Sequence, residues 1–145
     1  MKKTVQLFTL FAALLVIGTI ASCTRTCDLG YEGDHCVDPV RAKFLGTFSG
    51  SEACAAATDT FSVAFSEVSN DVTKIRINNI NNLSTNATGT VLENGSITLA
   101  QQSFGNGGTI NGSLTMVGGK IQLDYHITFD PSTGSQDITC TWVQN

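Results

Sequence analysis

Apolar and polar side chains alternate along most of the chain after about residue 44. The clearest stretch is 121–129, where Ile, Leu, Tyr, Ile and Phe alternate with Gln, Asp, His and Thr. Because successive side chains of a strand point to opposite faces, this pattern predicts half-buried β-strands. Alternating or β-branched runs predict eight strands, in or around residues 44–52, 61–65, 74–77, 88–92, 96–100, 109–116, 121–129 and 137–143.

Short turn sequences separate the predicted strands. Asn94-Gly95 and Gly118-Gly119 are typical of two-residue hairpin turns, whose central residues need positive φ. Looser hairpin loops are predicted at 69–72, 105–108 and 130–135. Consecutive hairpins leave no room for βαβ crossovers. The fold class is therefore all-β: about eight antiparallel strands in a meander, closed as an up-and-down barrel or folded over as a β-sandwich.

The longest apolar run lies at the N-terminus. Lys2 and Lys3 precede a run of fourteen residues, Leu7 to Ile20, that is apolar apart from two threonines and one glycine. A helix needs ~20 residues to span ~30 Å of hydrocarbon. A processed signal peptide therefore fits better than an uncleaved membrane helix.

The residues after this run are Ile20-Ala21-Ser22-Cys23. They resemble the lipobox of bacterial lipoproteins. In that family the cysteine sulfur takes a diacylglycerol, the peptide is cut just before it, and the new amine is acylated with a fatty acid such as palmitate. The resemblance implies a signal peptide over 1–22, lipid attachment at Cys23 and an outer-membrane location in the cell envelope, on the periplasmic face or the cell surface. The membrane is then a partner through the covalent anchor.

The charge of the remaining chain bears on other partners. Without the signal peptide the chain keeps six basic and twelve acidic residues, a net charge near −6. A nucleic-acid partner is disfavoured, because there is no basic patch to displace counterions from phosphates.

Five cysteines are an odd number, and lipid on Cys23 leaves four. In an oxidising compartment these four are expected to form two disulfides. The segment 27–36 reads C-x-x-G-Y-x-G-x-x-C and resembles the last loop of an EGF-like module, in which the flanking cysteines bond each other. The resemblance implies a Cys27–Cys36 bridge within a tether over 23–40. A complete module needs more cysteines, so we expect a clipped spacer, with a recognition role as the alternative.

The other two cysteines lie at the two ends of the predicted sheet. Cys54 follows the first strand and Cys140 lies within the last, with the same parity as Ile138 and Trp142. These strands are neighbours only if the sheet closes or its ends stack. A Cys54–Cys140 disulfide is therefore predicted, with a pair of free buried thiols as the alternative.

The segment KFLGTFSGSEAC at 43–54 opens the predicted barrel. It resembles the start of lipocalin-like (calycin) domains of small Bacteroidetes lipoproteins, which often carry Gly-x-Trp where this chain has Gly46-Thr47-Phe48. The resemblance covers roughly residues 41–145 and implies a barrel that holds an apolar ligand. The inward residues expected to line such a cavity are Phe48, Phe65, Leu123, Tyr125 and Trp142.

The sequence shows no common catalytic or metal-binding motif. It contains no G-x-S-x-G, H-E-x-x-H or phosphate-cradling glycine loop. His126 and Asp124 share one side of a strand, but no nucleophile is placed with them, so a surface polar pair is favoured over a catalytic one. Acidic residues around His35 in the tether are read as a solvated surface rather than a metal site. We expect no catalytic residues, no metal and no cofactor: the chain is not an enzyme.

Two functions remain. The first is a binding module, which holds a small apolar ligand or presents its loops to a protein or glycan. The second is a structural or interaction lipoprotein of the outer membrane, with a solidly filled barrel and an exposed apolar patch. The Asn-rich loop predicted at 78–87 is the candidate contact segment.

Overall fold

The structure of the chain, a computed structural model, describes residues 26–105, 107–129 and 137–145. The predicted signal peptide (1–22), the lipid-attachment residue Cys23 and the predicted loop at 130–135 lie outside the described residues.

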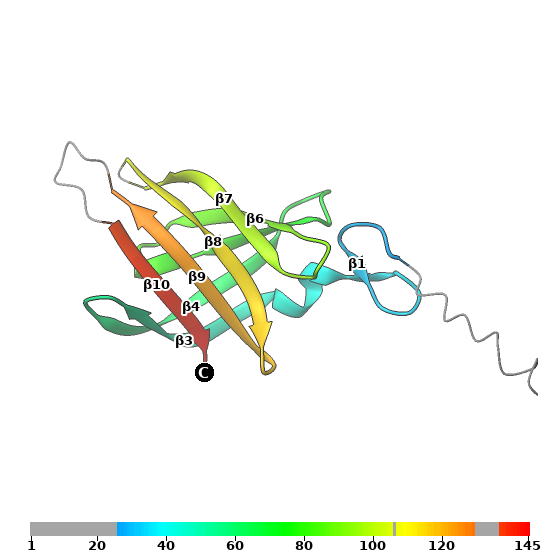
Figure 1. The fold of residues 1–145 in the computed structure, drawn as a ribbon, viewed down its shortest axis with the longest axis horizontal. Coiled ribbons are helices and arrows are strands. Elements are labelled where there is room, and N and C mark those ends of the chain that lie inside the picture. The colour runs from blue at the N-terminus through cyan, green and yellow to red at the C-terminus, as the bar shows by residue number, and fades with distance from the viewer. Residues whose placement is uncertain (1–25, 106, 130–136) are drawn as a thin grey trace, which may run out of the picture.

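Eight antiparallel strands form one closed barrel (Figure 1). Each strand pairs with the next along the chain, and the last strand also pairs with the first, so no edge is left open. The fold class is confirmed, and the barrel is the correct one of the two predicted arrangements. The strands are β3 Gly46–Cys54, β4 Thr58–Glu67, β5 Lys74–Asn78, β6 Asn86–Val91, β7 Ile97–Phe104, β8 Gly108–Val117, β9 Lys120–Thr128 and β10 Asp137–Gln144.

The barrel closes at the seam between β3 and β10. Their register runs from Cys54 opposite Cys140 to Gly50 opposite Gln144. The predicted Cys54–Cys140 disulfide spans this seam, with its Cα atoms 4.2 Å apart. The Cys27–Cys36 disulfide is present as well. Both pairings are confirmed.

Side chains that alternate inward along the strands meet in one contiguous core. Burial of this apolar surface is the main source of stability of such a domain, at ~25 cal/mol per Å². Every strand contributes, and the largest fully buried side chains include Trp142, Phe44, Phe104, Ile75, Ile77, Ile80, Ile97, Leu99, Ile110, Leu114, Ile121 and Leu123.

Glycines inside strands allow close approaches between neighbouring strands. A Cβ on Gly50 would lie 2.3 Å from the indole of Trp142, and one on Gly112 would lie 2.2 Å from the Asp124 carbonyl oxygen. Real Cβ atoms do not approach so closely, so the Trp142 side chain depends on a glycine in β3, and the backbone of β9 depends on one in β8.

Three predicted boundaries were wrong. Phe44 does not begin the first strand: it ends a 3₁₀ helix, η1 Val40–Phe44, and is fully buried where it covers one end of the barrel. Cys54 lies within the first strand, not after it. The turn at Asn94-Gly95 has three residues instead of two, because the Leu92 N–H bonds the Ser96 carbonyl and Glu93 joins the turn. Gly118-Gly119 is a two-residue turn, as predicted, with both φ angles positive.

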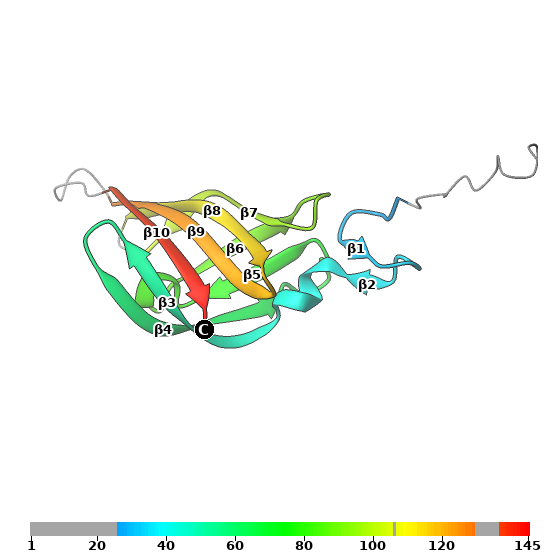
Figure 2. The ribbon, with the colours of Figure 1, turned by 60° about the horizontal axis from the view of Figure 1, so that its bottom comes forward.

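The segment 27–36, which we call the clip, lies against one end of the barrel (Figures 1 and 2). Its strand β1 (Tyr31–Glu32) pairs with β2 (Asp38–Pro39). The Val40 N–H donates to the Gly30 carbonyl over 2.9 Å, and Lys43 pairs with Glu32 at 2.8 Å. A Cβ on Gly30 would touch Val72 and Thr73 of the β4–β5 loop at 3.1 and 3.2 Å. The clip is therefore docked on the barrel.

Because consecutive strands are antiparallel, their connections alternate between the two ends of the barrel. The clip end carries η1, the β4–β5 loop, and the turns after β6 and β8. The mouth is the opposite end, formed by the β3–β4 turn (55–57), the β5–β6 loop (79–85) with the 3₁₀ turn η2 Ile80–Asn82, the β7–β8 loop and the start of β10. Figures 1 and 2 both show the clip and the β3–β4 turn at opposite ends of the molecule.

Candidate functional site

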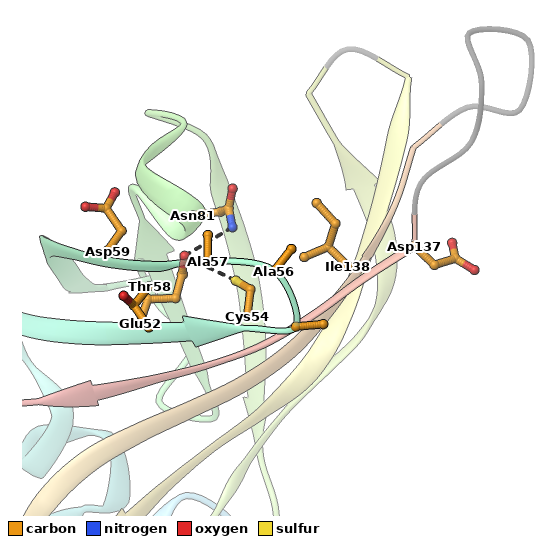
Figure 3. A pocket seen from close by; sticks show the side chains of 10 residues that line it. Glu52, Cys54, Ala56, Ala57, Thr58, Asp59, Asn81, Asp137 and Ile138 are labelled. Atoms are coloured by element: carbon orange, nitrogen blue, oxygen red, sulfur yellow. Dashed lines mark hydrogen bonds between the residues drawn. The ribbon is translucent and has the colours of Figure 1, made fainter.

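A pocket of about 440 Å³ opens at the mouth. It lies between the β3–β4 turn, the β5–β6 loop and the beginning of β10 (Figure 3). A volume of this size suits a small organic molecule. Its lining is mostly small or apolar and includes several acidic groups: Glu52, Cys54, Ala55, Ala56, Ala57, Thr58, Asp59, Asn81, Asp137 and Ile138.

Glu52 is the unusual member of this set, because it is an acid that faces the barrel interior. Along β3 the inward positions are Phe48, Gly50, Glu52 and Cys54. Only 5% of Glu52 is exposed, and it is one of two buried polar or charged residues among the described ones. Burial of a charged carboxylate is costly unless other groups compensate it.

Tyr125 provides one compensating hydrogen bond. It lies on an inward position of β9 and is 2% exposed. Its hydroxyl donates to Oε1 of Glu52. Burial and the bond to Glu52 raise the pKa of the Tyr125 phenol, so the hydroxyl keeps its proton and acts as the donor.

Asn81 provides the second compensating group. Its Nδ2 lies 3.3 Å from Oε2 of Glu52 and 3.0 Å from the Tyr125 hydroxyl. The backbone of Asn81 is left-handed, with φ of 53°, a conformation that Asn adopts more readily than most residues. The preceding Ile80 is fully buried and anchors the loop in the core. The side chain of Asn81 is thereby held over the carboxyl.

The electrostatic surroundings favour the neutral form of Glu52. Burial raises the pKa of this carboxyl, the hydrogen bond from Tyr125 acts in the opposite direction, and the negative charge of Asp59 raises it further. No basic residue offsets these effects, since the segments that form the mouth contain no Lys or Arg. The three ion pairs found among the described residues, Arg41–Glu67, Lys43–Glu32 and Lys74–Asp71, all lie at the clip end.

The Cys54–Cys140 disulfide forms part of the pocket wall beside Glu52. Oε2 of Glu52 lies 3.5 Å from Sγ of Cys54. Glu52, Cys54 and Cys140 are the group of potential metal ligands that the described residues bring together. Because the two sulfurs are bonded to each other, neither is a thiolate, and one carboxylate remains as a ligand. This arrangement does not suit a metal ion.

The groups of this cluster can form hydrogen bonds or an ion pair with a bound molecule. The cluster offers the Glu52 carboxyl and the Asn81 amide in the lining of the pocket, and the Tyr125 hydroxyl bonds both of them from the core. His126 and Asp124 lie on outward positions of β9, away from it, and Asp124 accepts hydrogen bonds from Thr141 at 2.6 Å and Gln122 at 2.8 Å. In the tether, Glu32 bonds Lys43.

The five residues predicted to line a ligand cavity lie in or against the core rather than on the mouth pocket. Phe65, Leu123, Tyr125 and Trp142 are at most 3% exposed, and Phe48 is half-buried. The rings of Phe48, Phe65 and Trp142 form a series with successive centroids 6.2 Å apart. Tyr125 reaches the mouth only through its hydroxyl. Their role in ligand binding stays a prediction.

Glu52 and Asn81 were not predicted to be site residues. Glu52 has the same strand parity as Phe48 and Cys54, and an acid at an inward position was the available signal. Asn81 lies in the loop 78–87, which was predicted to contact a partner and not to reach a pocket. Its contact with Glu52 depends on a left-handed turn and on strand closure, which the local sequence does not specify.

Comparisons with protein-family models, curated proteins and solved structures gave no match to this chain. Within the described part of the chain, no helix has the length and apolar character needed to cross a bilayer.

Proposed function

We propose that this protein is a lipid-anchored binding module of the cell envelope, and that it holds a small, largely apolar ligand in the mouth of its barrel. The observation that carries the proposal is the mouth pocket, with apolar walls and the Glu52–Tyr125–Asn81 cluster at its base. Ligand sites are commonly concave and apolar, with a few placed polar groups.

The position of the tether supports this proposal. Four cysteines are joined in two disulfides, and the fifth is Cys23, which follows the lipobox-like residues. Three residues separate Cys23 from Cys27, and even fully extended they span only ~10 Å. Lipid on Cys23 would therefore hold the clip close to the bilayer. The mouth, at the far end of the barrel, would face away from the membrane and stay accessible.

The contiguous core of buried side chains favours a second candidate, the structural or interaction lipoprotein with a solidly packed barrel. Its interacting surface would be the clip end, which carries most of the exposed large apolar side chains. They are Leu29, Tyr31, Val37, Leu92, Met116 and Val117. This candidate predicts that the protein carries no small molecule.

The anchor is tested by the intact mass of the protein extracted from membranes, before and after thiol alkylation. We expect an N-terminus at Cys23 with three acyl chains and no alkylatable thiol. A mature chain that begins at Met1, or a Cys23 that reacts with the alkylating reagent, would contradict the anchor.

The binding role is tested by native mass spectrometry of the protein purified from its own host. We expect the wild type to carry a co-purified small molecule, and the variant Ala56→Trp, which fills the mouth pocket, to lose it. Ala42→Trp is the matched control, because Ala42 is an exposed residue of η1 at the clip end. Equal retention in both variants would place the ligand elsewhere, and no ligand in any form would favour the structural candidate.

A further inference from the structure

The charges of the mouth indicate which ligands its pocket selects. Glu52 is 5% exposed and lines the pocket, and Asp59 and Asp137 lie on its exposed rim (Figure 3). The bases of the described residues lie elsewhere: Arg41, Lys43, Lys74 and Lys120 are at the clip end, and Arg76 is in the middle of β5. The mouth is thus a pocket of a single charge sign.

The hydrogen-bond partners of Glu52 do not neutralise the charge of its ionised carboxylate. The Tyr125 hydroxyl and the Asn81 amide are neutral donors, so they solvate the carboxylate without cancelling its charge. A buried carboxylate is stabilised when an opposite charge lies within ~4–6 Å. No described base lies there and burial favours the protonated acid, so a bound cation is the partner that can take the place of this proton and stabilise the ionised carboxylate.

The apolar walls of the pocket favour a ligand with an apolar body. The pocket that Glu52 lines also has apolar surface from Ala55, Ala56, Ala57, Ile138 and Cys54 of the Cys54–Cys140 disulfide. A hydrated metal ion would gain little from such walls and would find one buried carboxylate as its ligand. An organic ammonium group can donate to Oε2 of Glu52 while its carbon skeleton contacts the alanines and Ile138.

We infer that the mouth pocket binds small organic cations, namely primary amines with an apolar body, whose ammonium group pairs with the Glu52 carboxylate. This inference rests on the proposed binding function and names the ligand class for the same pocket. Asp59 and Asp137 raise the local concentration of cations at the rim, and Tyr125 and Asn81 orient the carboxylate.

The test uses three probes of nearly equal shape: 2-phenylethylammonium, 2-phenylethanol and phenylacetate. Each is titrated calorimetrically into the full-length mature protein in micelles of an uncharged detergent, with empty micelles as the blank. We expect the ammonium probe to bind about tenfold more tightly than the alcohol, since a charge-assisted hydrogen bond is stronger than a neutral one. The carboxylate probe is expected to bind most weakly.

Substitutions test which residues cause the preference for the ammonium probe. Glu52→Gln keeps the shape and the acceptor for Tyr125 but removes the charge, so it is expected to reduce the tenfold preference for the ammonium probe over the alcohol to about one. Asp59→Asn is expected to weaken ammonium binding two- to threefold through the exposed rim. Glu93→Gln, an exposed acid at the clip end, is the matched control and should change nothing.

The outcomes separate the two proposals. If alcohol and ammonium bind equally well, or if the preference survives Glu52→Gln, the ligand class is wrong while the binding pocket stands. If no probe binds, the ligand class is overturned, and a co-purified ligand that Ala56→Trp expels would still support the binding function. Should Glu52→Gln fail to fold, the ranking of the probes on the wild type and the effect of Asp59→Asn decide the question.

Discussion

The two ends of this barrel are built by opposite means. At the clip end, three ion pairs, a 3₁₀ helix and the clip fix the structure, and basic and acidic side chains neutralise one another. At the mouth the charges are all acidic, the turn residues are small, and a buried carboxyl has only neutral partners. The ion pairs of the described residues are therefore concentrated at the clip end, whereas the acidic groups of the mouth have no basic partner among those residues.

Arg41 shows how the clip end is held. Its Nη1 donates to the carbonyls of Val68, Asp71 and Lys74, at 3.1, 2.6 and 3.1 Å. Its Nη2 lies 3.2 Å from Oε1 of Glu67. One side chain thus joins η1 to the β4–β5 loop.

The largest effect is expected from loss of the disulfide at the seam. Cys54→Ala with Cys140→Ala removes a bridge over a sequence separation of 86 and should lower the free energy of unfolding by about 2–5 kcal/mol. Cys27→Ala with Cys36→Ala opens a clip that lies outside the barrel, so it should change barrel stability by less than about 1 kcal/mol. Denaturant unfolding followed by Trp142 fluorescence measures both. Equal losses would show that the clip and the barrel unfold as one unit.

A somewhat smaller loss is expected from Arg41→Ala. It leaves three carbonyls without their donor and should cost roughly 2–3 kcal/mol. Arg76→Ala is the control, because Arg76 is exposed on β5. The free energy of unfolding of this variant should stay within about 0.5 kcal/mol of the wild-type value. Thermal unfolding with far-ultraviolet circular dichroism provides the comparison. If the two variants match, Arg41 is not what holds the clip end.

Glu52→Gln is expected to raise the free energy of unfolding at neutral pH, in contrast to the variants above. The folded protein binds the Glu52 proton more tightly than the unfolded chain does, because burial raises the carboxyl pKa. The contribution of this group to stability is therefore complete below about pH 4.5 and falls as the pH rises through the raised pKa. At pH 7 the variant should be more stable than the wild type by about 1 kcal/mol, and at pH 4 the gain should vanish.

The measurement is the stability difference between Glu52→Gln and the wild type from pH 4 to pH 8. Glu93→Gln serves again as the matched exposed acid. A constant difference across this range would mean that Glu52 titrates as it would in water.

The smallest effect concerns Asp71 at the clip end. Hydrogen bonds from Thr73 and Lys74 lower the pKa of this carboxyl to about 2. Its contribution to stability is therefore present above about pH 3.8 and is lost as the pH falls toward 2. Asp71→Asn should flatten the acid limb of the stability profile between these values and leave the alkaline side unchanged. If the stability profiles of Asp71→Asn and the wild type ran parallel with pH, Asp71 would not contribute to acid unfolding.

The sequence predicted the framework better than the site. Period-two alternation identified the eight strands, and the parity of Cys140 with Trp142 correctly placed its sulfur inside. These features depend on local pattern alone. Gln102 shows the limit: its side chain bonds both the N–H and the carbonyl of Thr88 at 2.8 Å, at a register shift in β7 that no local pattern indicates. Arg41, Glu52 and Asn81 likewise gain their roles only from contacts distant in sequence.

The seam between β3 and β10 also determines when the barrel can close. Because β3 lacks its second neighbour until β10 is in place, the ring of strands closes only after the chain has been synthesised through β10. A chain cut short before Asp137 would leave β3 and β9 as bare edges and would lack the part of the pocket wall that Asp137 and Ile138 supply.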